Sequence, residues 1–332
     1  MAALTKINEA QYAKGEAILA DAERAKGKAL KAGFMSSLLG SSKEVKCEDA
    51  AELYQKAGNA FKMAKGWQEA GKAYSEAGQM HLEIKSNSYD AGNLFKDAGE
   101  CFEKVFPEDA VNAWQQAIQI FSDSGKWSTC GKLQQSISEI FEREDGSEGS
   151  AIESYEQAIA FFDMDSHSKM KARACMEKMA ALMVKVEDYL RAATCFEQLA
   201  EMCLASNLTS MGAKAHMLKV IYCSLCAEDP VAARTKLSEF VAKDYTFGSA
   251  REGEFATQLV EAYTAEDAQA FGQACADFNT IRKLPPDAIS MLSKCKRAIT
   301  VEEDPEPESV DEDTLEANPQ DDEEEEELDD LC

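Results

Sequence analysis

The residues best suited to chemistry are two cysteines separated by two residues, Cys223 and Cys226. Thiols at this spacing occur in redox motifs and in zinc sites. The pair lies inside a helical pattern, with no strand before it and no second pair to complete a metal site. The eleven cysteines are scattered and odd in number, which favours reduced thiols in the core over a disulfide framework. A regulatory enzyme or redox protein that uses this pair is therefore kept only as an alternative.

The three histidines, His81, His167 and His216, show no catalytic arrangement. His81 falls on a core-facing helical position and His167 in a polar loop. The sequence also lacks the HExxH and GxSxG motifs and a glycine-rich phosphate loop. We therefore expect no enzyme activity, metal or cofactor, and we expect a scaffold or adaptor.

A helical repeat must position whatever surface such a protein uses. In each unit a small residue is followed by a large one four residues later, a small or apolar one at seven and a large one at eleven. Ala50, Tyr54, Ala57 and Phe61 form one unit, and further units begin at residues 70, 91, 110, 130, 151, 172, 192 and 213. These offsets place all four side chains on one face of a helix.

Each unit predicts one helix and a short loop, so that two units form a helical hairpin. A single hairpin cannot bury its apolar face, whereas stacked hairpins can. We therefore predict an all-α fold, a right-handed TPR-like solenoid of antiparallel helical hairpins over residues 44–245. Residues 1–32 predict an N-terminal helix, and residues 246–300 predict a C-terminal helical bundle.

The charge of the chain is concentrated near its end. The chain carries 35 Lys and Arg against 61 Asp and Glu, a net charge of −26. Residues 301–332 hold 18 of the acidic residues and no basic one, which leaves 35 against 43, or −8, for the rest. So many like charges with little apolar surface predict a disordered acidic tail. The acidity argues against nucleic acid as a partner.

Residues 33–43 predict an apolar loop, in which Phe34, Met35, Leu38 and Leu39 stand between two glycines. The loop either packs back onto the first repeat or meets a lipid surface. Neighbouring lysines favour the second interpretation, so we expect weak, reversible contact with a membrane. The sequence has no signal peptide, apolar span or lipid-anchor motif. We expect a cytoplasmic protein that is peripheral on membranes.

At residues 51–82, AELYQKAGNAFKMAKGWQEAGKAYSEAGQMHL, the chain resembles the soluble NSF attachment proteins, most of all the alpha type. The likeness continues through YDAGNLFKDAGECFEK, AIESYEQAIAFF and FNTIRKL. The resemblance implies an adaptor that binds the four-helix, syntaxin-type SNARE bundle and recruits and stimulates the NSF hexamer. ATP hydrolysis by NSF then disassembles the bundle, which supports vesicle fusion and intracellular protein transport.

SNARE bundles are largely acidic, so the implied contact needs basic side chains. Equivalent turns of a solenoid line up, and we expect a row of cations along one edge. The candidates are Lys62, Lys65, Lys104, Lys126, Lys132, Lys171 and Arg173. Ala174 stands where the family carries a basic residue, beside Arg173.

The resemblance places the contact with NSF at the other end of the chain. The implied acidic residues there are Glu261, Glu266 and Asp267, together with Asp329, Asp330 and the apolar Leu331 of the tail. This tail is longer than in the alpha type, and its Leu-Cys ending is similar to the gamma type. The alternative function is a generic TPR-like scaffold for another peptide or chaperone partner, although the period near 40 residues differs from the 34 of that repeat.

Overall fold

The computed structural model describes residues 2–35, 41–84, 88–205 and 209–300, and within these ranges it contains helices and turns but no strand. The helices in chain order are α1 (Ala2–Met35), α2 (Ser41–Met63), α3 (Trp67–Leu82), α4 (Ser88–Phe102), α5 (Pro107–Asp123), α6 (Trp127–Arg143), α7 (Glu148–Asp163), α8 (Lys169–Lys185), α9 (Tyr189–Leu204), α10 (Ser210–Cys226), α11 (Pro230–Lys243), α12 (Tyr245–Gly248), α13 (Arg251–Thr264), α14 (Ala268–Ile281) and α15 (Pro286–Ala298). The predicted all-α fold is confirmed.

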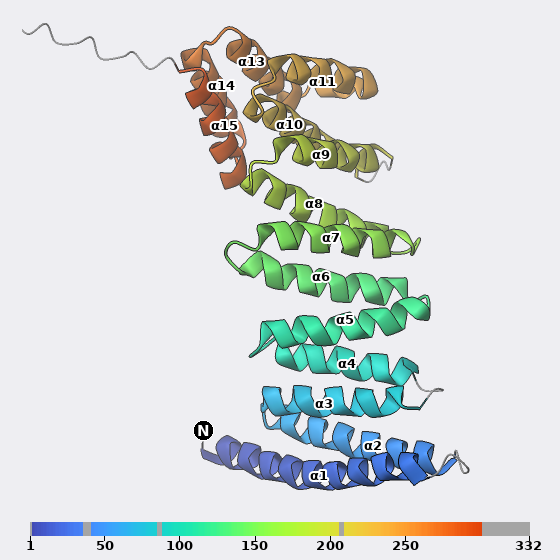
Figure 1. Ribbon diagram of the computed structural model, residues 1–332. Coiled ribbons are helices and arrows are strands. Elements are labelled where there is room, and N and C mark those ends of the chain that lie inside the picture. The colour runs from blue at the N-terminus through green and yellow to red at the C-terminus, as the bar shows by residue number, and fades with distance from the viewer. Residues whose placement is uncertain (1, 36–40, 85–87, 206–208, 301–332) are drawn as a thin grey trace, which may run out of the picture.

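Consecutive helices from α1 to α10 pack against one another in antiparallel pairs and form an elongated stack (Figure 1). The arrangement changes after α10. Helix α13 packs on both α10 and α11, α14 packs on α13, and α15 contacts α10. The molecule is thus a solenoid of helical hairpins that ends in a group of more closely crossed helices.

The repeat positions form the core. In α5, for example, Ala110, Trp114, Ala117 and Phe121 are all buried. Small residues on one helix allow large rings of its neighbour to approach the backbone closely. A Cβ atom on Gly131 of α6 would lie only 2.6 Å from ring carbons of Phe162 in α7. The alternation of small and large residues therefore fixes the close spacing of the helices.

The buried side chains form two large groups along the stack and a small third group of Ala29, Cys47 and Ile84. One large group contains buried residues from Ala22 to Ile140, and the other contains buried residues from Ala151 to Ile299. Phe141, at the end of α6, packs against both groups and links them. The C-terminal helices therefore share a continuous core with α7 to α10.

Several three-residue turns have a middle residue in the left-handed backbone conformation. The φ angle is 61° at Lys65, 62° at Glu187 and 56° at Glu266. At the first turn, the N–H of Gly66 donates to the carbonyl of Phe61 over 2.9 Å and closes the end of α2. Such turns reverse the chain abruptly, so adjacent helices are antiparallel and the turns lie at two opposite edges of the stack.

The expected loop over residues 33–43 is shorter than predicted, because residues 33–35 belong to α1 and residues 41–43 to α2. A glycine inside a helix costs about 1 kcal/mol, so Gly33 does not by itself end α1. Leu38, Leu39 and residues 301–332 lie outside the described residues. No helix in the described part of the chain is long and apolar enough to cross a membrane.

Candidate protein-binding surfaces

The direction of the helices sorts the basic candidates into two sets. The turns after even-numbered helices lie at one edge of the stack, on the left of Figure 1, and those after odd-numbered helices at the other. Lys62 lies in the last turn of α2, Lys65 in the α2–α3 turn and Lys104 in the α4–α5 turn. These three residues share the first edge and are called the Lys104 cluster.

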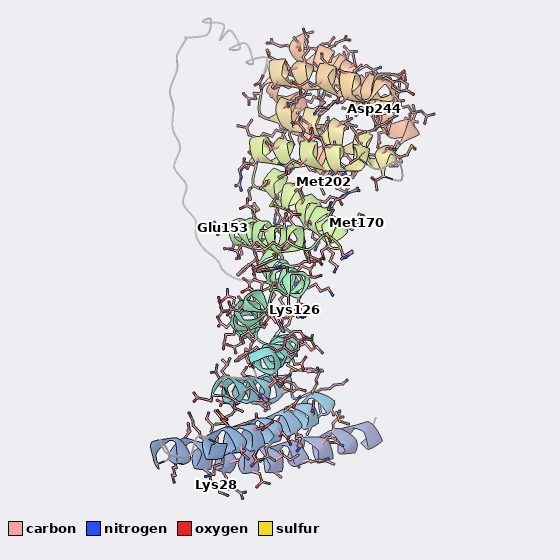
Figure 2. The ribbon with its side chains drawn as sticks, turned by 90° about the vertical axis from the view of Figure 1, so that its right-hand side faces the viewer. Lys28, Lys126, Glu153, Met170, Met202 and Asp244 are labelled. Carbon is pink, nitrogen blue, oxygen red and sulfur yellow. The ribbon has the colours of Figure 1, made fainter. Side chains whose placement is uncertain are left out.

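The remaining candidates lie at the second edge and are called the Lys126 cluster. Lys126 precedes α6 directly, and Lys132 lies in its first half. Lys171 and Arg173 lie in the first turns of α8. The Lys171 Nζ is 3.4 Å from the Ser128 Oγ, which joins the beginnings of α6 and α8. Figure 2 turns this edge toward the viewer and shows Lys126 below Met170, the second residue of α8.

The expectation of a single row of cations along one edge was therefore wrong. Lys65 and Lys104 follow even-numbered helices, whereas Lys126 follows α5, so the antiparallel chain carries it to the opposite edge. All seven candidates nevertheless belong to, or directly adjoin, the even-numbered helices α2, α4, α6 and α8. The Lys104 cluster thus lies at or just beyond the C-terminal ends of α2 and α4, and the Lys126 cluster lies toward the N-terminal ends of α6 and α8.

The candidates differ in whether a carboxylate already neutralises them. Arg173 is the most sequestered, since its side chain is 18% exposed and its Nε lies 3.1 Å from the Glu177 carboxylate. Lys62 has a longer contact of 3.9 Å with Glu100. Within the described residues, no carboxylate lies within 4.0 Å of the other five, Lys65, Lys104, Lys126, Lys132 and Lys171.

Aromatic rings lie beneath several of these cations. The Lys104 Nζ is 3.6 Å from the ring centroid of Trp67, at the start of α3. The Lys126 Nζ is 6.0 Å from the ring of Tyr89. A cation above an aromatic face is stabilised by about 0.5–1 kcal/mol at an exposed site and keeps its charge available to a partner. The rings therefore hold these lysines in place without neutralising them.

The acidic candidates Glu261, Glu266 and Asp267 lie together at the α13–α14 turn. Glu266 is the left-handed residue of this turn. The Asp267 carboxylate accepts a hydrogen bond of 2.8 Å from the N–H of Ala270 and so caps α14. Glu261 is exposed one turn before the end of α13. The turn therefore presents three carboxylates on a fixed backbone.

A shallow groove of about 460 Å³ runs from this turn between α13 and α14 and is lined by Glu261, Asp267 and Asp277. Asp277 was missed in the sequence; it lies on the same face of α14 as the groove residues Ala270 and Ala274, seven and three residues before it. No basic residue lines this groove. Asp329, Asp330 and Leu331 lie outside the described residues, as do Leu38 and Leu39. Phe34 and Met35 belong to the last turn of α1.

The cysteine pair Cys223 and Cys226 is buried in α10. Burial raises the pKa of the Cys223 thiol well above its usual range, which disfavours the reactive thiolate. The near neighbour of Cys226 is not Cys223 but Cys295 of α15, with 3.3 Å between the sulfur atoms. Among the described residues, no group of three or more His, Cys, Asp or Glu side chains is placed to hold a metal ion.

Comparison with known proteins agrees with this architecture. Residues 13–300 match the model of the family described as "Soluble NSF attachment protein, SNAP". The chain is 32% identical to the alpha-soluble NSF attachment protein of Mus musculus over 297 residues, which cover 90% of this chain and 98% of that protein. It is 30% identical to the beta-soluble NSF attachment protein of Bos taurus, over 86% of this chain and 94% of that one. It is also 30% identical to the vesicular-fusion protein SEC17 of Komagataella phaffii, over 82% and 91%. The chain therefore belongs to the soluble NSF attachment protein family.

Proposed function

We propose that this chain holds assembled SNARE complexes against the NSF hexamer and stimulates its ATPase, so that ATP hydrolysis disassembles the complexes. Membership of the family makes the chain a non-enzymatic adaptor of SNAREs and NSF in vesicle fusion. Its place of action is the cytoplasmic surface of membranes.

One observation carries the SNARE contact: among the described residues, five exposed or half-buried lysines on or beside the even-numbered helices have no carboxylate within 4.0 Å. Cations without a carboxylate within 4.0 Å also occur on odd-numbered helices in the described residues, as at Lys14 and Lys72, so it is the grouping of these five lysines at the ends of the even-numbered helices that supports the contact. Many other lysines are paired, as Lys185 is with Glu148 at 2.8 Å and Lys243 with Glu201 at 2.7 Å. Unpaired cations attract an acidic rod and speed its encounter.

The contact with NSF is assigned to the acidic groove between α13 and α14 and to Asp329, Asp330 and Leu331. The groove lies at the opposite end of the molecule from α1 (Figure 1). A basic surface on NSF would complement its three carboxylates, and Leu331 would add apolar contact. An adaptor with separate ends for two partners can transmit force along the stack between them.

The membrane contact is assigned to Phe34, Met35, Leu38 and Leu39. Phe34 and Met35 belong to the last turn of α1, at the end of the stack remote from the NSF groove. Partial burial of such side chains in lipid is a weak, reversible interaction. The membrane contact contributes more to affinity when binding to the SNARE complex already holds the chain near the bilayer, because it is then effectively intramolecular.

The SNARE contact is tested by reversing Lys126→Glu together with Lys132→Glu and measuring affinity for a soluble assembled SNARE complex. The matched control is Lys14→Glu with Lys72→Glu. Both control lysines are exposed, lie on the odd-numbered helices α1 and α3, and have no carboxylate within 4.0 Å in the described residues. The net charge change is the same in both variants.

We expect the Lys126 and Lys132 variant to bind roughly tenfold or more weakly at low salt, with a smaller loss at high salt because ions screen the contact. The control should bind within about a factor of three of the unmodified chain, because it changes only the total charge. Equal losses in the two variants would show that net charge, and not the Lys126 cluster, governs binding. Unchanged affinity in both would favour the generic scaffold.

A further inference from the structure

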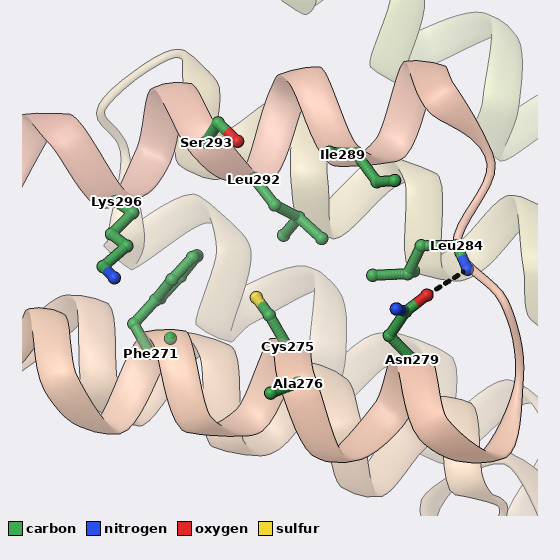
Figure 3. Close-up of a pocket in the computed structure, with 10 residues that line it drawn as sticks. Phe271, Cys275, Ala276, Asn279, Leu284, Ile289, Leu292, Ser293 and Lys296 are labelled. Atoms are coloured by element: carbon green, nitrogen blue, oxygen red, sulfur yellow. Dashed lines mark hydrogen bonds between the residues drawn. The ribbon is translucent and has the colours of Figure 1, made fainter.

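An open apolar groove separates the last two helices, on the side of α14 away from the acidic groove. Phe271, Cys275, Leu284, Ile289 and Leu292 point into the space between α14 and α15 (Figure 3). The groove encloses about 310 Å³. At one end, the Asn279 Oδ1 accepts a hydrogen bond of 2.9 Å from the N–H of Leu284, which fixes the loop that closes it.

The other end of the groove is basic. Lys296 closes it, and Arg297 follows in the last turn of α15. No carboxylate lies within 4.0 Å of either cation in the described part of the chain. Their neighbours on α15 are already neutralised, since Lys294 pairs with Glu187 at 2.7 Å and Asp287 with Lys219 at 2.8 Å.

The apolar lining is accessible at its rim, whereas Phe271 and Leu292 are themselves buried. The Ile289 side chain at the rim is 48% exposed, and Ile281, close by at the end of α14, is 60% exposed. An apolar groove with a cationic end fits a segment that carries large apolar residues among carboxylates. The same chain contains such a segment in residues 321–332, where nine acidic residues surround Leu328 and Leu331.

We propose that residues 321–332 dock in the groove between α14 and α15 of the same molecule. Leu328 and Leu331 occupy the apolar lining, and the surrounding carboxylates face Lys296 and Arg297. In a helical turn, leucines three residues apart share one face, so both can enter the groove between α14 and α15. The docked segment would cover side chains that are otherwise exposed to water.

The length of the connecting chain permits this contact. Helix α15 ends at Ala298, and about 27 residues separate the last described residue from Leu328. A neutral flexible chain of that length has a root-mean-square span of roughly 30 Å, and repulsion between the carboxylates of this one extends it further, whereas α15 itself is about 20 Å long. The segment is therefore held near the groove at an effective concentration in the millimolar range, which supports a weak contact.

Docking would also control the proposed contact with NSF. Leu331 is the residue assigned to that contact, so a docked segment withholds it until NSF competes for it. This consequence rests on the proposed function, whereas the docking itself does not. The test below contains neither SNAREs nor NSF, so its failure and the failure of the proposed function are distinguishable.

Cys275 offers a direct probe, because it lines the groove and is the only described cysteine that is not fully buried. The experiment follows alkylation of Cys275 by N-ethylmaleimide in the full-length chain, with peptide mass spectrometry to separate it from other cysteines. The test variant is Leu328→Ser with Leu331→Ser. The matched control is Leu315→Ser, in the same acidic stretch but outside the docking segment.

We expect Cys275 to react at least threefold faster in the double variant than in the unmodified chain, with the control unchanged. Salt at 0.5 M should bring the unmodified chain toward the faster rate, because it screens the carboxylates from Lys296 and Arg297. Adding a free peptide of residues 321–332 should slow the reaction of the double variant again. Equal rates in all three chains would overturn the proposal. Protection that grows with protein concentration would also overturn it and would assign the groove to a second copy.

Discussion

The substitution Gly131→Ala tests whether close contact between glycine and aromatic residues sets the spacing of the stack. Gly131 lies in α6, and a Cβ atom there would lie 2.6 Å from two ring carbons of Phe162. Phe162 is fully buried in α7, so its ring has no free space to enter. Gly27 provides the matched control, because it lies inside α1 and a Cβ atom there meets nothing within 4 Å.

The two substitutions are chemically identical but should have opposite signs. Replacing a helical glycine by alanine stabilises a helix by about 0.8–1 kcal/mol, which is the full effect expected at Gly27. At Gly131 the ring must move by about 1 Å to restore a normal carbon–carbon distance. Overpacking of this kind costs about 1–3 kcal/mol. The net result is destabilisation by about 1 kcal/mol, and the two variants should differ by about 2 kcal/mol.

The assay is equilibrium unfolding in urea, followed by far-ultraviolet circular dichroism and accepted only where the slopes of the variants agree. Gly131→Ala should lower the unfolding midpoint, and Gly27→Ala should raise it. A Gly131→Ala chain as stable as the Gly27→Ala chain would refute the reasoning, because it would mean that helix propensity alone decides both positions.

Three further predictions concern the core and the membrane contact. Ser154→Ala should destabilise the fold by about 1–3 kcal/mol in the same unfolding assay. The cause is that the buried Gln134 side-chain amide, 2.8 Å from the Ser154 Oγ, loses its hydrogen-bond acceptor. Adding Gln134→Leu should restore stability, and a double variant that stays as unstable as Ser154→Ala would contradict this cause. Burial holds the pKa of His216 below its usual 6.5, partly offset by Glu177 at 3.7 Å, so its contribution to stability is complete above pH 6.5 and is lost as the pH falls below that value. The midpoint should therefore fall less between pH 7.5 and pH 5.5 in His216→Phe than in the unmodified chain, and an identical fall would remove His216 as a cause. Phe34→Ser with Leu38→Ser should slow disassembly of membrane-anchored SNARE complexes and spare soluble ones, whereas equal slowing would indicate that these residues support the fold.

The repeat made the fold predictable from the sequence. Ala110, Trp114, Ala117 and Phe121 are buried because residues at these offsets share one face of a helix, which is local geometry. The weaker unit at Cys130, Gln134, Ile137 and Phe141 was harder to interpret, since a polar residue stands at its second position. The structure explains it: the Gln134 amide donates to Ser154 of the next helix, a pairing between helices that no spacing within one unit reveals.

The candidate surfaces were predicted less completely. The basic residue types and their nearness to turns were evident in the sequence, but the side of the stack on which each turn lies depends on counting helices correctly. Lys126 follows an odd-numbered helix and therefore lies at the opposite edge of the stack from Lys65 and Lys104. Charge pairing also depends on the fold, because Arg173 pairs with Glu177 whereas Lys104 lies over Trp67. The helical end of α1 at Met35 was missed because glycine disfavours a helix without forbidding it.

Reconstituted disassembly tests the central claim most directly. Purified NSF, ATP and a fluorescently labelled SNARE complex are combined with this chain, without it, and with the Lys126→Glu, Lys132→Glu variant. The adaptor account predicts ATP-dependent disassembly with the unmodified chain, little without it, and slower disassembly with the variant at low salt. Disassembly at the same rate with and without the chain would contradict the account.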